Sequence, residues 1–375
     1  MNKNELKTPC YIINKAKIEE NCQVLQSVME RTGCEILLAQ KAFSCYELYP
    51  LIGTYLAGAA SSGLYEARLA RAHFPGESHV YSAAFRPDDF PEILAYSDKI
   101  IFNSIAQLKA YAPLAKARGI SVGLRINPEH STQTGSGIYD PCAPGSRLGV
   151  TIDQFDHSIL PLLDGLHFHT LCEQDAAPLL ETVAAVEVKF GKCLHDLTWL
   201  NLGGGHHITK AGYDIQTLET CIKHLQETYG LRIYLEPGEA IALNAGYLQT
   251  TVLDIVVNGG VQIAILDTSA ACHMPDVIEM PYRPPLKDSG QPGEYAHSYR
   301  LGGPTCLSGD VIGDYSFQNP LKVGDRLFFE DMAIYTMVKN NTFNGMPLPD
   351  IVLEEVNGAC TVLRQFDYED FKMRL

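Results

Sequence analysis

Lys41 is the residue of this sequence whose surroundings most favour covalent chemistry. It follows the apolar run 36–39 and Gln40, so its amine is expected at the end of a buried strand. Burial disfavours the charged form of an amine, and the neutral amine that results can condense with an aldehyde. Most lysines are solvated surface charges, and the strand end distinguishes this one. The sequence therefore predicts a reactive lysine at position 41.

Other residues that follow apolar runs could bind a phosphorylated aromatic cofactor. Gly203, Gly204 and Gly205 would let backbone N–H groups approach a phosphate, although a plain tight turn is an equally good interpretation. Glu236 could keep a pyridine nitrogen protonated, or form a structural ion pair. His169 could lie flat on a ring, or be an ordinary core histidine.

The elements expected to position these residues alternate regularly through the first two thirds of the chain. Helices are expected between apolar runs of strand length, for example after Asn14 and after Ser104, which begins a capping-box pattern with Gln107. The expected strands are 35–39, 55–59, 79–82, 100–102, 121–126, 165–169, 198–202 and 231–235. Eight strand–helix repeats in about 240 residues match an α/β fold of the (β/α)₈ barrel type; a doubly wound open sheet is the rival. In a barrel, Lys41, Arg125 and the groups above would share the face formed by the carboxyl ends of the strands.

The last third of the chain has a different character. Strands are expected at 248–257 and 261–267, joined by the hairpin signal Asn258-Gly259-Gly260, and at 299–301, 326–330 and 351–355. The opening segment 7–13 is expected to add another strand. We therefore predict a barrel over residues 15–244 and a mostly antiparallel β domain built from 1–14 and 245–375.

Composition excludes several classes of function. The 375 residues carry a formal net charge of −15, which disfavours nucleic acid or an anionic membrane surface as partner and favours cationic small molecules. The sequence has no run of eighteen apolar residues, so no membrane span is predicted. The N-terminus lacks the apolar core of a signal peptide. The eleven cysteines form no CxxC pair and the histidines no zinc motif, so we expect reduced thiols, no metal and a cytoplasmic location.

Several short motifs along the chain belong to one known pattern. They are Lys7-Thr8-Pro9, Leu38-Ala39-Gln40-Lys41, Ser61-Ser62-Gly63, Ser146-Arg147-Leu148-Gly149, His167-Phe168-His169, Gly203–Gly205, Glu236-Pro237-Gly238-Glu239-Ala240, Cys306-Leu307-Ser308-Gly309-Asp310, Tyr335–Lys339 and Thr342-Phe343-Asn344-Gly345. Together they resemble the alanine racemase/ornithine decarboxylase superfamily of pyridoxal 5′-phosphate (PLP) enzymes, over nearly the whole chain. The resemblance is strongest to the carboxynorspermidine/carboxyspermidine decarboxylases of polyamine synthesis.

The resemblance implies roles for individual residues. Lys41 would hold PLP as a Schiff base, His169 would stack on its ring, and Glu236 would pair with the pyridine nitrogen. Tyr335 and the three glycines would hold the phosphate, and Arg125 is expected among the cofactor-binding residues. Cys306 would reach the active site of the opposite subunit in a homodimer with shared sites and protonate Cα after CO₂ leaves.

Departures from the pattern bear on the substrate. Glu239 stands where ornithine decarboxylases have a phosphate-binding arginine, and Leu307 stands where they have an aspartate for the distal amine. These changes suggest a longer, more cationic substrate. The resemblance indicates Glu239 and Asp276 as amine contacts, and Asp267 is a further candidate; carboxylates pair well with ammonium groups. A loop-capping role is the alternative for Asp276.

The predicted activity is decarboxylation of carboxyspermidine or carboxynorspermidine. No convincing counterparts exist for the arginines that diaminopimelate decarboxylases use, although Arg147 remains a candidate. The alternatives are a decarboxylase of diaminopimelate or another basic amino acid, a racemase on the same scaffold, and a non-catalytic homologue that binds partners.

Overall fold

The computed structural model describes residues 2–133 and 137–375. The chain forms two compact units. The barrel unit comprises Glu19–Ile241, and the β unit comprises Met1–Ile18 with Ala242–Leu375.

The barrel unit contains a closed parallel barrel. Its eight strands within the described residues are β2 (Glu35–Ala39), β3 (Gly58–Ser61), β4 (Glu77–Tyr81), β5 (Lys99–Phe102), β6 (Ser121–Arg125), β7 (Gly165–His167), β8 (Trp199–Asn201) and β9 (Arg232–Leu235). Each strand pairs in parallel with the next, and β9 pairs with β2 to close the ring. The predicted (β/α)₈ barrel is confirmed, and the open-sheet alternative is wrong.

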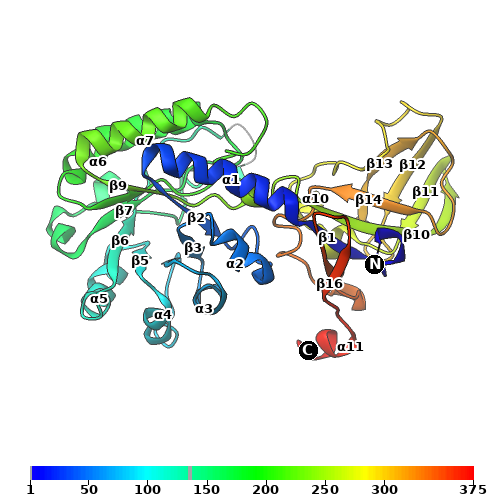
Figure 1. Ribbon diagram of the computed structural model, residues 1–375, viewed down its shortest axis with the longest axis horizontal. Helices are drawn as coiled ribbons and strands as arrows, with labels where there is room; N and C mark the ends of the chain where they lie inside the picture. Colours follow the sequence, from blue (N-terminus) through cyan, green and yellow to red (C-terminus); the bar gives the residue numbers. More distant parts are fainter. Residues whose placement is uncertain (1, 134–136) are drawn as a thin grey trace. The chain divides into compact units, whose positions relative to one another are not determined.

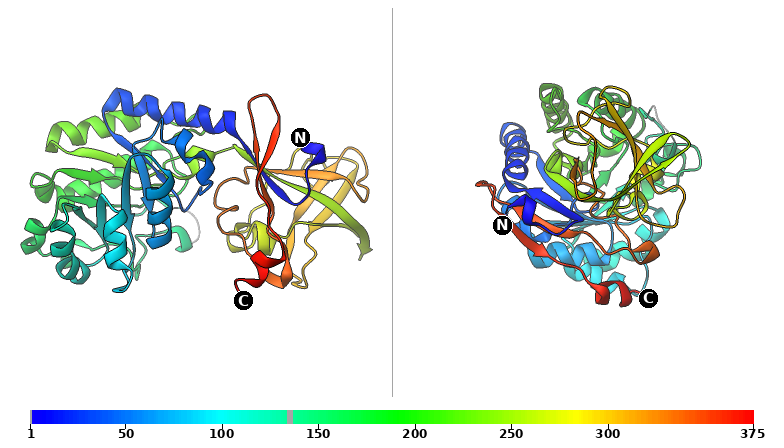
Figure 2. Two further views of the ribbon diagram at one scale, coloured as in Figure 1. Left: turned by 60° about the horizontal axis from the view of Figure 1, so that its bottom comes forward. Right: turned by 90° about the vertical axis from the view of Figure 1, so that its right-hand side faces the viewer.

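Helices surround the barrel strands, as Figures 1 and 2 show. They are α1 (Lys15–Thr32), α2 (Tyr49–Ile52), α3 (Leu64–His73), α4 (Phe90–Tyr96), α5 (Ile105–Lys116), α6 (Ala176–Leu194) and α7 (Ile215–Tyr229). The cap predicted for α5 is present, because the Ser104 side chain accepts a hydrogen bond from the Gln107 N–H. After β6 the chain instead forms short 3₁₀ turns, including η4 (Ile152–Gln154) and η5 (His157–Leu162).

The barrel interior is filled around Trp199. Its ring packs in a cluster with Leu37, Ile101 and Tyr234. A Cβ atom added at Gly165 would lie 2.0 Å from the Trp199 ring, so only glycine leaves room for the indole. The core is therefore packed, which leaves the strand ends as the place for a site.

The β unit is built on a mixed sheet in the order β13 (Val311–Phe317), β12 (His297–Gly302), β11 (Val261–Leu266), β10 (Gly246–Asn258), β1 (Cys10–Asn14), β15 (Asp350–Glu354) and β16 (Cys360–Arg364), with β14 (Arg326–Glu330) paired to β10. Among the described residues, the pairings are antiparallel except β1 with β15 and β11 with β12. The predicted hairpin is present, and Gly259 and Gly260 have φ of 56° and 79°.

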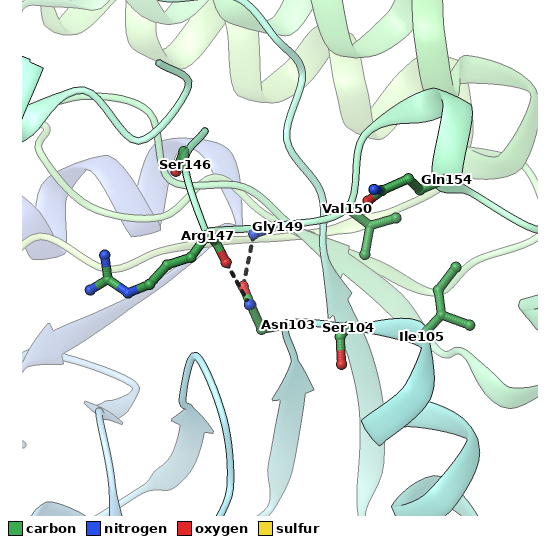
Figure 3. Close-up of a pocket in the computed structure, with 8 residues that line it drawn as sticks. All are labelled: Asn103, Ser104, Ile105, Ser146, Arg147, Gly149, Val150 and Gln154. Atoms are coloured by element: carbon green, nitrogen blue, oxygen red, sulfur yellow. Dashed lines mark hydrogen bonds between the residues drawn. The ribbon is translucent and has the colours of Figure 1, made fainter. Parts of the chain in front are cut away.

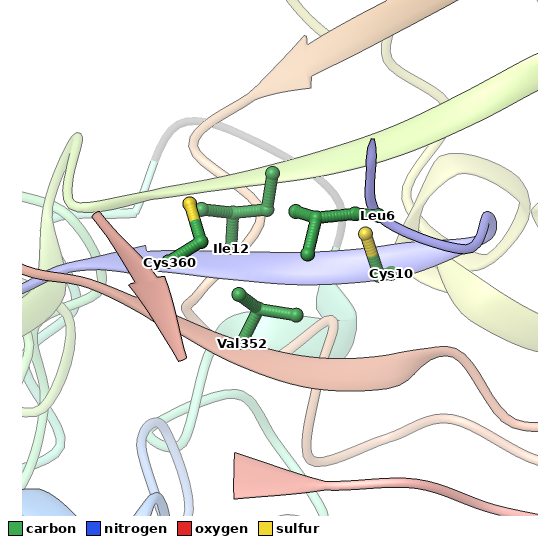
Figure 4. Close-up of a cluster of buried hydrophobic side chains, with 5 residues drawn as sticks. All are labelled: Leu6, Cys10, Ile12, Val352 and Cys360. Atoms are coloured by element: carbon green, nitrogen blue, oxygen red, sulfur yellow. The ribbon is translucent and has the colours of Figure 1, made fainter. Parts of the chain in front are cut away.

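The N-terminal strand is tied into the β unit by a small apolar cluster (Figure 4). Cys10 and Ile12 of β1 are fully buried and pack with Leu6, Val352 and Cys360. All eleven cysteines, each within the described ranges, are free thiols. No helix in the described ranges is both long and apolar enough to cross a bilayer.

Candidate active site

Lys41 follows strand β2, and the residue before it is fixed in the barrel wall. The Gln40 amide is fully buried and donates to Ser61 Oγ (2.7 Å) and to the Glu66 carbonyl (3.0 Å). The Tyr49 hydroxyl donates to the other end of the same amide, at 3.0 Å. These bonds fix the backbone from which the lysine side chain extends.

The environment of the Lys41 amine favours its neutral form. The side chain is accessible to solvent, yet protein atoms surround it closely enough for desolvation to lower its pKa. The nearby Arg125 guanidinium lowers the pKa further, and the Glu236 carboxylate partly opposes this effect. The amine is therefore more nucleophilic at neutral pH than that of an ordinary lysine.

Glu236 is a buried anion next to strand β9. Asn201 donates to its Oε1 at 2.7 Å, and His167 Nε2 lies 3.3 Å from its Oε2. Burial alone would raise the carboxyl pKa, but His167 and Asn201 outweigh it and bring the pKa to about 2. A carboxylate that stays charged in this environment is suited to hold a protonated nitrogen.

The glycine loop is shaped by close backbone contacts. A Cβ atom at Gly204 would lie 2.5 Å from the Glu236 carbonyl oxygen, so the loop requires glycine there. The prediction that the N–H groups are free for a phosphate is wrong for two residues: Gly203 donates to Asn201 Oδ1 (2.8 Å) and Gly204 to His169 Nδ1 (3.0 Å). Within the described residues, the Gly205 N–H has no hydrogen-bond acceptor.

His169 and Arg125 lie together at the same end of the barrel. Because Nδ1 of His169 accepts from Gly204, the neutral ring carries its proton on Nε2. Desolvation and the cations Lys41 and Arg125 hold the His169 pKa well below its ordinary value. Arg125 donates to the His169 carbonyl at 3.0 Å, and its guanidinium lies 4.9 Å from the centre of the Tyr81 ring. The structure thus brings the predicted barrel residues into one site.

Glu239 has a partner that the sequence did not reveal. It begins the short helix α8 (Glu239–Ala242), and its Oε1 lies 3.6 Å from His207 Nε2. His207 is buried, and neither ring nitrogen has a hydrogen-bond partner among the described residues. His207 carried no distinguishing signal beyond its place two residues after the glycines.

A metal ion is a further chemical possibility at this site. The ligand atoms of His167, His169 and Glu236 lie within 4.8 Å of one another. However, Gly204 already donates to His169, and His167 and Asn201 are bonded to Glu236. The prediction that the protein needs no metal stays a prediction.

Ser146, Arg147 and Gly149 line a hollow of the barrel unit at the end of β5 (Figure 3). The Asn103 amide donates to the Arg147 carbonyl (2.8 Å) and accepts from the Gly149 N–H (2.7 Å). The cavity has a volume of about 390 Å³, and the Arg147 side chain is exposed. These bonds give the motif a structural role in anchoring its loop.

The β unit contains the other predicted site residues. Cys306 is exposed on the loop between β12 and β13, and its N–H donates to Asn344 Oδ1 at 2.7 Å. Tyr335 has φ of 47°, and its carbonyl accepts from the Lys339 N–H at 2.7 Å. Asp276 forms an ion pair with the Lys339 amine, which Glu279 shares.

Asp267 is engaged within the β unit itself. Its Oδ1 accepts from Thr250 Oγ1 (2.5 Å) and the Thr251 N–H (2.9 Å). Thr8 Oγ1 donates to its Oδ2 at 2.6 Å. Both carboxylate oxygens therefore tie the N-terminal segment to β10 and to the end of β11. The predicted substrate contact at Asp267 stays a prediction.

The barrel residues fit PLP as a cofactor. Lys41 offers an amine of lowered pKa for its aldehyde, Glu236 an anion for its pyridinium, and His169 an uncharged ring. The Gly205 N–H remains available as a donor for its phosphate. Fold and site together define a barrel enzyme of the PLP-dependent class.

Comparison with known proteins narrows the class to a family. Residues 10–333 match the family described as pyridoxal-dependent decarboxylase, C-terminal sheet domain. The chain therefore belongs to the pyridoxal-dependent decarboxylases, and it is a PLP-dependent carboxy-lyase.

Particular relatives are similar over almost the full length. The carboxynorspermidine/carboxyspermidine decarboxylase of Campylobacter jejuni is 41% identical, with 99% of each chain covered. The carboxyaminopropylagmatine decarboxylase of Synechocystis is also 41% identical, over 99% of this chain and 96% of the relative. The crystal structure of C. jejuni carboxynorspermidine decarboxylase complexed with norspermidine superposes with a TM-score of 0.92 at 40% identity, over 99% of this chain and 100% of that one. Diaminopimelate decarboxylase from Helicobacter pylori shares the fold at 20% identity, with a TM-score of 0.83 over 99% of this chain and 97% of that one.

Proposed function

We propose that this enzyme decarboxylates carboxyspermidine or carboxynorspermidine in polyamine biosynthesis. The observation that carries the proposal is the full-length likeness, at 40% identity, to the decarboxylase solved with norspermidine. The diaminopimelate decarboxylases, at 19–26% identity, support the fold but not that substrate.

The residues of the barrel unit would perform the following tasks. Bound PLP supplies an electron sink for the carbanion left by CO₂. Lys41 holds it covalently, and Glu236 keeps the pyridine nitrogen protonated because its own pKa is about 2. His169 is uncharged and fixed by Gly204. It can therefore lie against the cofactor ring without placing a second positive charge beside the protonated pyridine nitrogen.

Further residues would complete the site in a dimer. We propose a cytoplasmic homodimer in which Cys306 of the partner subunit protonates Cα, and the exposure of this thiol supports the role. Tyr335 and the Gly205 N–H would contact the phosphate, with Arg125 close to the cofactor.

The substrate's amines would meet carboxylates. Glu239 belongs to the segment that contacts the end of β2 just before Lys41, since the Ala39 N–H donates to the Pro237 carbonyl at 3.2 Å. Asp276 pairs with the Lys339 amine, and a substrate ammonium group would share or replace this partner. Charge-assisted hydrogen bonds of this kind would favour a polycationic substrate.

A second candidate substrate is carboxyaminopropylagmatine. The Synechocystis enzyme with that name is as similar to this chain as the C. jejuni enzyme, at 41% identity. The difference lies at the distal end of the substrate, a guanidinium in place of an ammonium.

The test is CO₂ release from each carboxylated polyamine, from carboxyaminopropylagmatine and from diaminopimelate, with kcat/KM measured side by side. We expect the highest value for carboxyspermidine or carboxynorspermidine. A higher value for carboxyaminopropylagmatine or diaminopimelate would overturn the proposed substrate. Racemisation without CO₂ release, or no PLP absorbance, would overturn the decarboxylase assignment.

A further inference from the structure

We infer that Asn344 is a positioning residue that sets the place of the Cys306 thiol. The inference rests on the proposed function, in which Cys306 delivers the proton to Cα. It concerns a contact within the β unit, the hydrogen bond of 2.7 Å from the Cys306 N–H to Asn344 Oδ1.

The base of the loop that carries Cys306 is anchored by Asp310. This carboxylate is 4% exposed and accepts from Thr305 Oγ1 (2.7 Å) and Ser269 Oγ (2.9 Å). The Gly303 N–H donates to the Asp310 carbonyl at 2.9 Å. The bonds of Asp310 therefore fix the loop on both sides of its tip.

The tip itself is exposed, from Cys306 to Gly309. Among the described residues, Asn344 is the one residue outside this loop that forms a hydrogen bond with Cys306. Without it, the thiol would sit on an exposed segment held only at its base. Proton transfer needs the donor within hydrogen-bond reach of the acceptor atom, and misplacement by about 1 Å can cost a large factor in rate.

Asn344 is well placed to give this support, because its own segment is fixed. The preceding Phe343 N–H donates to Asn341 Oδ1 (2.9 Å), and Asn341 Nδ2 donates to the Ala271 carbonyl (2.8 Å). The Cys272 thiol also donates to the Phe343 carbonyl, at 3.5 Å.

The backbone at Asn344 explains the residue type. It has φ of 60° and ψ of 20°, the left-handed region, which asparagine tolerates better than most side chains. Glycine adopts the same conformation freely. Asn344→Gly therefore removes the hydrogen-bond acceptor without adding backbone strain, and Asn344→Asp keeps an acceptor at the same place.

The experiment compares Asn344→Gly, Asn344→Asp and Cys306→Ala in the PLP-loaded enzyme, with CO₂, polyamine and aldehyde measured together. A proton delivered to Cα gives one polyamine per CO₂. A proton that instead reaches the cofactor carbon leads, after addition of water, to an aldehyde, while the amino nitrogen stays on the cofactor. The aldehyde fraction therefore reports where the proton went, which general loss of stability would not change.

We expect Asn344→Gly to raise the aldehyde fraction and to lower kcat about threefold to tenfold, the equivalent of one lost hydrogen bond. KM should stay within about twofold of the wild-type value. Asn344→Asp, which keeps the acceptor, should give the wild-type ratio of polyamine to aldehyde. If Cys306→Ala produces aldehyde but Asn344→Gly does not, the positioning role is overturned and the proposed function stands. If Cys306→Ala itself leaves the products unchanged, the proton-donor role fails, and the inference fails with it.

Hydrogen exchange on the wild-type enzyme covers the case in which Asn344→Gly does not fold. The Cys306 amide should exchange more slowly than the amides of Leu307 and Ser308, which lie on the same exposed tip. Equal exchange rates for the three amides would overturn the inference.

Discussion

Replacing Glu236 with glutamine should remove a charge while keeping the shape of the side chain. Glutamine can still accept the 2.7 Å hydrogen bond from Asn201, so the change is mainly electrostatic. The surrounding groups bring the pKa of Glu236 from 4.5 to about 2, which corresponds to about 3 kcal/mol in favour of the anion. Protonating this carboxylate would therefore be costly, and it stays an anion beside the pyridine nitrogen. If the resulting charge pair is worth a similar amount, its loss lowers kcat about a hundredfold, because about 1.4 kcal/mol is worth a factor of ten.

The assay is CO₂ release at saturating substrate, after absorbance has shown that the variant binds PLP. Glu239→Gln is the matched control, since it removes a carboxylate three residues away that is not assigned to the cofactor ring. The control should keep kcat near the wild-type value. A kcat of PLP-loaded Glu236→Gln within about threefold of wild type would refute the reasoning, because about 3 kcal/mol could not then depend on this charge.

Three further predictions concern the substrate, the dimer and the lysine. Glu239→Gln and Asp276→Asn should chiefly raise KM, since they remove amine contacts remote from the breaking bond; an unchanged KM in both would refute these contacts. Mixing Lys41→Ala with Cys306→Ala protein should restore part of the activity, because one site of each heterodimer regains both groups; confirmed but inactive heterodimers would contradict shared sites. The lowered pKa of Lys41 means that its amine loses its proton below pH 10.5, so the rate of PLP capture by the apoenzyme should level off below that pH. A rate that still rises through pH 10.5 would contradict the desolvated amine.

Much of the barrel follows from local sequence. The run at 35–39 is apolar over the full length of a strand, and β2 has the predicted bounds Glu35–Ala39. The strand predicted at 55–59 is wrong in position, because residues after α2 continue its turns: the Leu56 N–H donates to the Ile52 carbonyl at 3.0 Å. Strand β3 begins only at Gly58.

Strands β13 and β16 of the β unit were missed. In Val311–Phe317 the burial pattern lacks clean alternation, and Gly313 and Asp314 interrupt the apolar residues. These segments become strands by pairing with β12 and β15, and such pairing depends on partners elsewhere in the chain.

The candidate site was predictable where a residue type and a strand end coincide, as for Lys41 and Glu236. The partners of these groups could not be predicted in the same way. Asn201 contacts Glu236 across 35 residues, and Asn344 contacts Cys306 across 38. Only the folded chain brings such pairs together, so the hydrogen-bond partners of the site residues could be found only from the structure.

The most direct test of the account is to find which side chain carries the cofactor. The purified enzyme loaded with PLP is reduced with borohydride, digested and mapped by mass spectrometry. The account predicts a pyridoxyl group on Lys41, the amine at the end of β2 whose pKa is lowered by desolvation. A pyridoxyl group on another lysine, or on none, would contradict it.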